Sequence, residues 1–206
     1  MIFDSPILCL VTNQVRSEID CTLEIIESVT SCGVNMIQVR EKSMEHESLL
    51  DYIKKIHVVK NDSLLIVNSN IKVNQFLYVD GIHLSESTEK LDDFIDSKFI
   101  VGQSVHSIES ARIAYSNNVD YLIAGTMFQS KSHPGGPLSG TVLIEQIKNE
   151  LDIPVIGIGG INQSNVKEVM NAGANGVAVI GSILEDKNPV NATQRLKSIM
   201  DENFRG

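Results

Sequence analysis

Short apolar runs alternate along this chain with segments of helical periodicity, and this alternation strongly constrains its fold. Eight apolar runs each end at, or are directly followed by, a polar residue or a glycine: residues 7–11, 36–40, 64–68, 81–84, 99–102, 120–124, 156–161 and 176–182. The segments with helical spacing are residues 23–32, 49–58, 71–77, 107–115, 142–149 and 166–172. Strands that alternate with helices in this way specify a parallel sheet with helices outside it.

The alternation predicts an α/β protein, a single (β/α)8 TIM barrel that uses residues 1–206 as one domain. A length of 206 residues lies at the short end for this fold, and 42% hydrophobic residues suffice for one large core. No linker or low-complexity segment divides the chain. Only a short helix, residues 71–77, fits between the third and fourth strands.

The last two apolar runs end in glycines, and this predicts a phosphate site. Glycine lets the backbone approach a ligand closely, and free N–H groups at the start of a helix bind anions. In TIM barrels such a site lies in the loops after strands 7 and 8. The residues expected to bind phosphate are Gly159, Gly160, Ile180 and Gly181.

Polar side chains follow the other strands, at the end where the strands of a barrel share one mouth. Gln38, Arg40 and Lys42 stand two residues apart in an extended segment, so their side chains share one face. Two cations and an amide on one face suit an anionic ligand. The further candidates at the mouth are Asn68, His83, Ser104, His106, Thr126, Ser130, Ser132 and His133.

Charge and cysteine content narrow the class of partner. A net charge of −9 argues against a nucleic-acid surface and favours a small-molecule substrate. The 3 cysteines have no metal-like spacing, and Cys9 reads as a core residue. Neither a signal peptide nor a long apolar run is evident, so we expect a cytoplasmic protein that does not interact with a membrane.

Several short motifs, in order and across nearly the whole chain, resemble the thiamin phosphate synthase superfamily and its thiazole tautomerase (TenI-type) branch. They are QVREK at 38–42, VN at 67–68, DGIHL at 80–84, GQSVHS at 102–107, GTMF at 125–128, IGGI at 158–161 and VAV at 177–179. The resemblance implies that the first two motifs and Ser104 bind a pyrimidine diphosphate in the synthases. It also implies that residues 130–133 bind phosphate, and that Gly160, Ile180 and Gly181 hold thiazole phosphate in both branches.

Departures from the synthase pattern favour the tautomerase branch. Where the synthases carry two aspartates that hold magnesium, this chain has Ser69 and a neighbour of Thr88, and His133 replaces a phosphate-binding lysine. Magnesium usually takes one or two carboxylates from a protein, so no metal site and no cofactor are expected. The GQSVHS motif is also closer to the tautomerase form.

The sequence-based expectation is therefore an isomerase, a thiazole tautomerase that aromatises thiazole carboxylate phosphate by proton transfer. Tautomerases carry their histidine where this chain has Thr126, so His133 or His106 is expected to move the proton. Arg40 and Lys42 would steady the substrate carboxylate. His83 reads as a structural histidine, and His106 has the alternative role of orienting its loop beside the helix cap Ser107.

Two alternatives stay open. The first is a transferase, thiamin phosphate synthase itself (thiamin-phosphate diphosphorylase), with altered magnesium ligands. The second is a regulator that binds thiazole or thiamin phosphate without catalysis. The oligomeric state is also open, a homodimer included.

Overall fold

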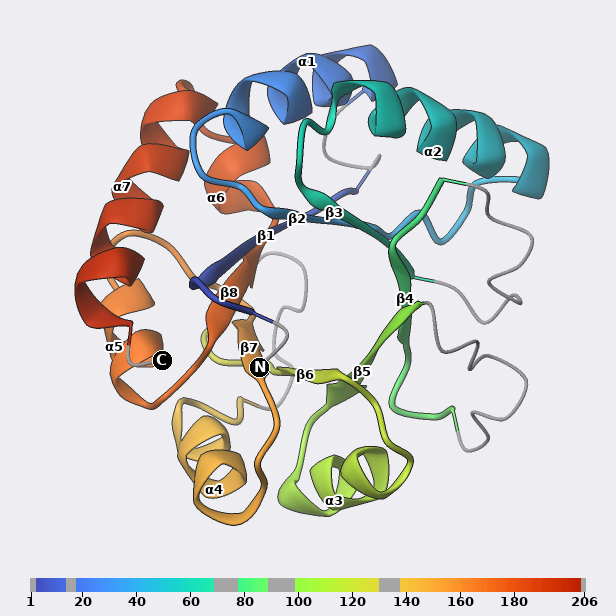
Figure 1. Cartoon of the computed structure of the whole chain (residues 1–206). Helices are drawn as coiled ribbons and strands as arrows, with labels where there is room; N and C mark the ends of the chain where they lie inside the picture. Colours follow the sequence, from blue (N-terminus) through green and yellow to red (C-terminus); the bar gives the residue numbers. More distant parts are fainter. Residues whose placement is uncertain (1–2, 14–17, 69–77, 89–98, 130–137, 205–206) are drawn as a thin grey trace.

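A computed structural model of the chain, which describes residues 3–13, 18–68, 78–88, 99–129 and 138–204, contains a closed parallel barrel (Figure 1). Its strands pair in sequence order from β1 to β8, and β8 pairs with β1. The strands are β1 Ile7–Val11, β2 Met36–Val39, β3 Leu64–Asn68, β4 Gly81–Leu84, β5 Ile100–Val105, β6 Tyr121–Ala124, β7 Val155–Ile158 and β8 Gly176–Val179. The predicted (β/α)8 TIM barrel is confirmed.

Helices cover the outside of the barrel, and Figure 1 shows α3 and α4 on the opposite side from α1 and α2. The helices are α1 Ile19–Thr30, α2 His46–Val59, α3 Ile108–Ser116, α4 Val142–Glu150, α5 Val166–Asn171, α6 Gly181–Leu184 and α7 Pro189–Asn203. The predicted helix at 71–77 lies outside the described residues. No helix in the described ranges is long and apolar enough to cross a membrane.

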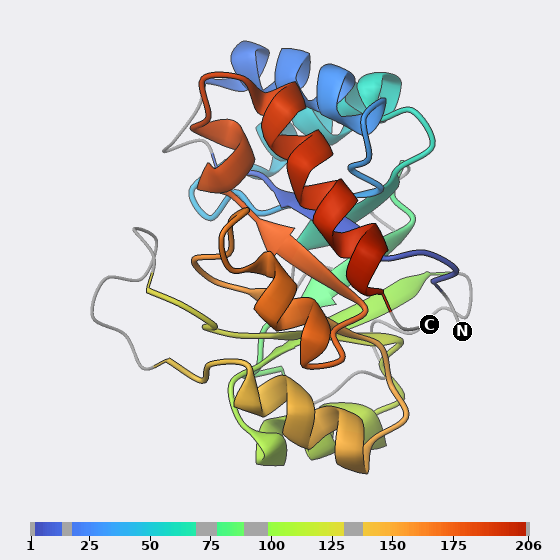
Figure 2. The ribbon, with the colours of Figure 1, turned by 90° about the vertical axis from the view of Figure 1, so that its left-hand side faces the viewer.

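The longest helix in the described part of the chain, α7, was not among the helices predicted from apolar spacing. Its buried residues are Thr193, Leu196 and Met200, so its apolar stripe is sparse. Local signals at its start are clear instead: the Asn188 side chain accepts a hydrogen bond from the Asn191 amide, and Pro189 takes the first turn. Figure 2 shows α7 along the outside of the barrel, where it packs against α5, α1 and α6.

Strand residues alternate between two cores, as the period of a strand requires. On β1, Leu8 and Leu10 pack outward in the cluster that includes the helices, while Ile7, Cys9 and Val11 pack inside the barrel. The same alternation turns other side chains toward the barrel interior, in the layer nearest the carboxyl ends of the strands. These inward-facing polar residues are Gln38, Asn68, His83 and Ser104.

The end of β5 differs from the sequence-based prediction. β5 runs to Val105 and pairs with β6 through Ser104 and Val105. Ser104 therefore lies within the strand and does not follow it. The reason is the parallel register with β6, which extends regular pairing beyond Gly102.

Candidate functional site

A cavity of about 730 Å³ opens at the carboxyl ends of the strands. This is the end at which TIM barrels carry their active sites. The structure brings these predicted site residues to the cavity wall: Gln38, Arg40, Lys42, Asn68, Ser104, His106, Thr126, Gly159, Gly160, Ile180 and Gly181. Three further candidates, Ser130, Ser132 and His133, lie outside the described residues.

Backbone amides line the side of the cavity formed by β7 and β8. Within the described ranges, the N–H groups of Gly159, Gly160 and Gly181 donate no hydrogen bond to the protein. The side chains of Asn162 and Asn165 both donate to the Gly160 carbonyl, at 3.2 and 3.1 Å, which fixes the peptide that follows Gly160. Free amide donors on a fixed backbone suit the oxygen atoms of a phosphate group.

Position 160 requires glycine for two reasons, its backbone conformation and the lack of room for a side chain. Its φ of +64° lies in the left-handed region, and a Cβ atom there would lie 2.7 Å from the carbonyl oxygen of Phe128. The loop after β6 is held against it, because the amides of Met127 and Phe128 donate to Ile158 and Gly159. A side chain at position 160 would therefore displace this loop as well as the amides.

Across the barrel, β2 and β3 contribute a pair of amide side chains. Gln38 Nε2 donates to Asn68 Oδ1 at 3.3 Å, and Gln38 is 3% exposed. The other atom of the amide, Gln38 Oε1, is buried and has no hydrogen-bond partner in the described structure. A buried acceptor without a partner is costly, so this atom is a natural contact for a ligand N–H group.

His83 on β4 lies between two hydroxyl groups inside the barrel. Its Nε2 is 2.8 Å from Ser104 Oγ, and its Nδ1 is 3.3 Å from the hydroxyl oxygen of Tyr121. Burial, and secondarily the charge of Arg40, lower the pKa of His83 to about 3. His83 is thus uncharged at neutral pH, and its two nitrogens are both satisfied while the residue borders the cavity.

Positive charge enters the cavity from the end of β2. Arg40 and Lys42 both line the wall, and neither forms an ion pair with another described residue. The Thr12 hydroxyl accepts from the Arg40 amide at 3.2 Å and donates to the Glu41 carboxylate at 2.6 Å. Glu41, which stands between the two cations in the sequence, therefore has its carboxylate bound to Thr12. An acidic chain thus presents two cations to the cavity, which favours an anionic ligand.

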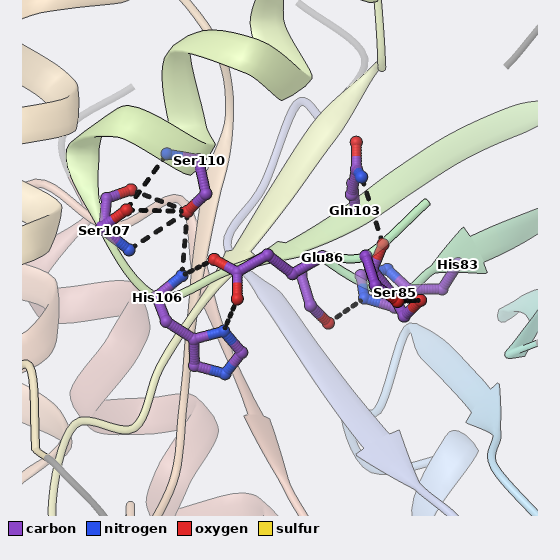
Figure 3. A network of polar contacts seen from close by, with 9 residues as sticks. His83, Ser85, Glu86, Gln103, His106, Ser107 and Ser110 are labelled. Carbon is purple, nitrogen blue, oxygen red and sulfur yellow. Dashed lines mark hydrogen bonds and ion pairs between the residues drawn. The ribbon is translucent and has the colours of Figure 1, made fainter. Parts of the chain in front are cut away.

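A carboxylate and an imidazole meet at the rim of the cavity, between the loop after β4 and the end of β5 (Figure 3). His106 Nδ1 is 2.8 Å from Glu86 Oε2. The expected cap is also present, because Ser107 accepts a hydrogen bond from the Ser110 amide at the start of α3. His106 therefore lies beside this cap, and its ring is held by Glu86.

Magnesium ligands are not found among the described residues. The carboxylates on the cavity wall are Glu86, which binds His106, and Glu185, which comes from the far side of the barrel after α6. Thr88 does not line the cavity, and Ser69 lies outside the described residues. No group of three His, Cys, Asp or Glu side chains in the described ranges has the arrangement of a metal site. The described residues thus do not fit a resident magnesium ion.

Several lining residues were missed by reasoning from sequence. They are Asn13, Ser85, Glu86, Gln129, Asn162, Ser182 and Glu185. Asn13 lies two residues after the end of β1, so searching for polar residues after every strand would have found it. Glu86 pairs with His106 from a different loop, and no local sequence pattern indicates such a pair.

Comparisons with known proteins find similar sequences along most of the chain. The family model described as thiamine monophosphate synthase matches residues 8–183. The thiamine-phosphate synthase of Dictyoglomus turgidum is 31% identical over 208 residues, covering 96% of this chain and 91% of that protein. The enzyme of the same name from Coprothermobacter proteolyticus is 32% identical over 176 residues, with 82% of each chain covered.

A solved structure extends the likeness to three dimensions. The thiamine phosphate pyrophosphorylase of Pyrococcus furiosus superposes with a TM-score of 0.82 at 25% identity, and 97% of each chain is covered. The similar sequences carry the name thiamine-phosphate synthase, and this similar structure carries the name thiamine phosphate pyrophosphorylase.

These comparisons correct the functional expectation. The prediction of an isomerase, a thiazole tautomerase, is wrong, because the relatives at about 30% identity carry the name of a transferase. The prediction rested on a few loop positions, whereas the match covers the barrel from residue 8 to residue 183. Loop positions vary more readily than the framework that presents them, so they were the weaker guide.

Proposed function

The chain belongs to the thiamine monophosphate synthase family, and we propose that it is itself a thiamine-phosphate synthase. In this reaction the ring nitrogen of a thiazole phosphate attacks the methylene carbon of a pyrimidine diphosphate. The new carbon–nitrogen bond replaces the carbon–oxygen bond to the diphosphate, which leaves with the bonding electrons. No net proton transfer is needed, so neither His106 nor His133 is required as an acid or base.

One observation carries the proposal: a single cavity has two separate places for anions, which come from different strands. Arg40 and Lys42 extend from β2, and the free amides of Gly159, Gly160 and Gly181 follow β7 and β8. In the closed barrel, β1 separates β2 from β8, and β8 and β1 separate it from β7, so the two places occupy different stretches of one cavity wall. A transferase that joins a diphosphate to a phosphate needs two such places at once.

The roles follow from this division. We propose that the amides of Gly159, Gly160 and Gly181, with Ile180 beside them, hold the thiazole phosphate. Arg40 and Lys42 neutralise the diphosphate, whose negative charge grows as it leaves. Gln38, Asn68 and Ser104 contact the pyrimidine ring, and Thr126 lies next to the phosphate loop. No step is assigned to a metal ion bound by this chain, because the described residues do not fit one.

The test is coupling of the two substrates by the purified protein. Pyrimidine diphosphate and thiazole phosphate are supplied with and without added magnesium, and thiamin phosphate and free diphosphate are measured together. Equal release of both products supports the synthase. Diphosphate release that continues without thiazole phosphate would show a hydrolase, and binding of both ligands without turnover would show a binding protein. Either result overturns the proposal.

A further inference from the structure

Tyr121 is a buried tyrosine of the barrel interior that the proposed reaction does not use. It lies on β6, is fully buried, and has its ring edge-on to Phe3 with 6.0 Å between ring centres. The ring occupies the space above Gly102, where even a Cβ atom would overlap it. Its position is therefore well fixed, and its hydroxyl group lies at Nδ1 of His83.

The ionisation states of the two residues are determined by burial. Burial, with smaller contributions from Cys9 and Asp120, raises the pKa of Tyr121 well above its usual value, so the hydroxyl keeps its hydrogen. His83 is uncharged, since its pKa is lowered to about 3, first by burial and then by Arg40. A neutral imidazole carries one hydrogen, on either Nδ1 or Nε2.

Hydrogen-bond accounting selects one of the two tautomers. Within the described part of the chain, the Tyr121 hydroxyl has one partner, His83 Nδ1. If Nδ1 carried the hydrogen, the buried Tyr121 O–H would have no acceptor, which costs free energy. If Nε2 carries it, Tyr121 donates to Nδ1, and Nε2–H donates to Ser104 Oγ at 2.8 Å. The Tyr121 hydroxyl and both ring nitrogens of His83 are then satisfied.

We propose that Tyr121 is a positioning residue that acts through His83 and makes the Ser104 hydroxyl a hydrogen-bond donor to the ligand. Ser104 already accepts from His83, so its own hydrogen is free to point into the cavity that it borders. The ligand atom at Ser104 is therefore a hydrogen-bond acceptor. On the proposed function, on which only this last step rests, that atom is an unprotonated ring nitrogen of the pyrimidine.

The tautomer can be measured without any substrate. The protein contains 5 histidines, and nitrogen-15 labelling of histidine gives one pair of ring signals for each. The signals of His83 are assigned by their loss in His83→Gln. We expect a protonated Nε2 and a bare Nδ1 for His83. A hydrogen on Nδ1 would overturn the proposal, whatever reaction the protein catalyses.

Tyr121→Phe tests the role of the hydroxyl, because phenylalanine keeps the ring above Gly102. Without the donor, the preference for one tautomer weakens, and we expect the two nitrogen shifts of His83 to move toward each other. Unchanged shifts would contradict a positioning role. Tyr52→Phe is the matched control: it removes another hydroxyl from a buried tyrosine, one on α2 that does not line the cavity, and should leave His83 unchanged.

Kinetics then separate the positioning role from a structural one. We expect Tyr121→Phe to lower kcat/KM for pyrimidine diphosphate about five- to tenfold and to leave the KM for thiazole phosphate unchanged, as for loss of one hydrogen bond. Because Tyr121 acts through Ser104, adding Tyr121→Phe to Ser104→Ala should cause no further loss. Additive losses would refute the relay.

Analogues test the identity of the ligand atom. Each ring nitrogen of the pyrimidine diphosphate is replaced in turn by C–H, and binding is measured by calorimetry. One replacement should weaken binding to the natural protein but not to Ser104→Ala. Equal penalties in both proteins would overturn the assignment to a ring nitrogen. If coupling activity is absent, the proposed function fails, whereas the measured tautomer still decides the role of Tyr121.

Discussion

Glu86 holds His106 at two points, through Oε2 at 2.8 Å from the ring Nδ1 and through Oε1 at 3.0 Å from the backbone amide. Ser110 Oγ lies 3.2 Å from the same amide and belongs to the cap of α3. The ring and the backbone of His106 are therefore fixed by a residue from a different loop. This contact joins the loop after β4 to the start of α3 at the rim of the cavity.

Glu86→Gln should make the protein less stable at neutral pH, and the difference should fade in acid. Burial alone would raise the pKa of Glu86, but hydrogen bonds from Ser110 and His106 outweigh it and lower the pKa. A lowered carboxyl pKa stabilises the fold above the ordinary pKa of glutamate, and this contribution is lost as pH falls through the lowered value. Urea unfolding from neutral to acidic pH measures it. Glu24→Gln, an exposed site on α1, should show no such trend.

His83 should make the protein lose stability as pH falls below about 6.5, because the unfolded chain then gains a proton that the folded chain refuses. This contribution is complete above the unfolded pKa and is lost progressively down to the folded pKa of about 3. Between roughly pH 6 and pH 4, the free energy of unfolding should fall more steeply than in His83→Asn, by about 1.4 kcal/mol per pH unit. Equal slopes in the two proteins would show that His83 has the same pKa in the folded and the unfolded chain.

The strands of the barrel and the residues at their ends could be predicted from the sequence, whereas the side-chain contacts between loops could not. Gln38 and Asn68 could be placed at the mouth because each ends an apolar run, and strand ends share one edge. The Glu86–His106 pair spans two loops, and no spacing rule relates such residues. In the sequence, Tyr121 looks like one more apolar strand residue. A role for its hydroxyl group becomes visible only when the register between β5 and β6 is known. Local sequence patterns cannot predict which side chains from different strands or loops will contact one another in the folded barrel.

Replacing Arg40 or Lys42 by glutamine should weaken one substrate selectively. Both cations come from the end of β2, whereas the free amides follow β7 and β8. We therefore expect the KM for pyrimidine diphosphate to rise about tenfold, as for a loss of roughly 1.4 kcal/mol, with little change for thiazole phosphate. Steady-state kinetics with each substrate varied in turn measures this. Lys55→Gln, which breaks a surface pair with Asp51, is the control. An equal rise for both substrates would contradict two separate anion sites.

Gly160→Ala should abolish phosphate binding, whereas Gly140→Ala should not. The two glycines have nearly the same left-handed φ, +64° and +60°, so alanine costs each about 1 kcal/mol in backbone conformation. They differ in surroundings: a Cβ at Gly160 meets the carbonyl groups of Phe128 and Gln129, while nothing lies within 4 Å of a Cβ at Gly140. Calorimetric titration with thiazole phosphate should show at least about tenfold weaker binding for Gly160→Ala alone, or roughly 1.4 kcal/mol. If both variants bind as the natural protein does, the amides after β7 do not hold the phosphate. If both weaken equally, backbone strain and not the site is responsible.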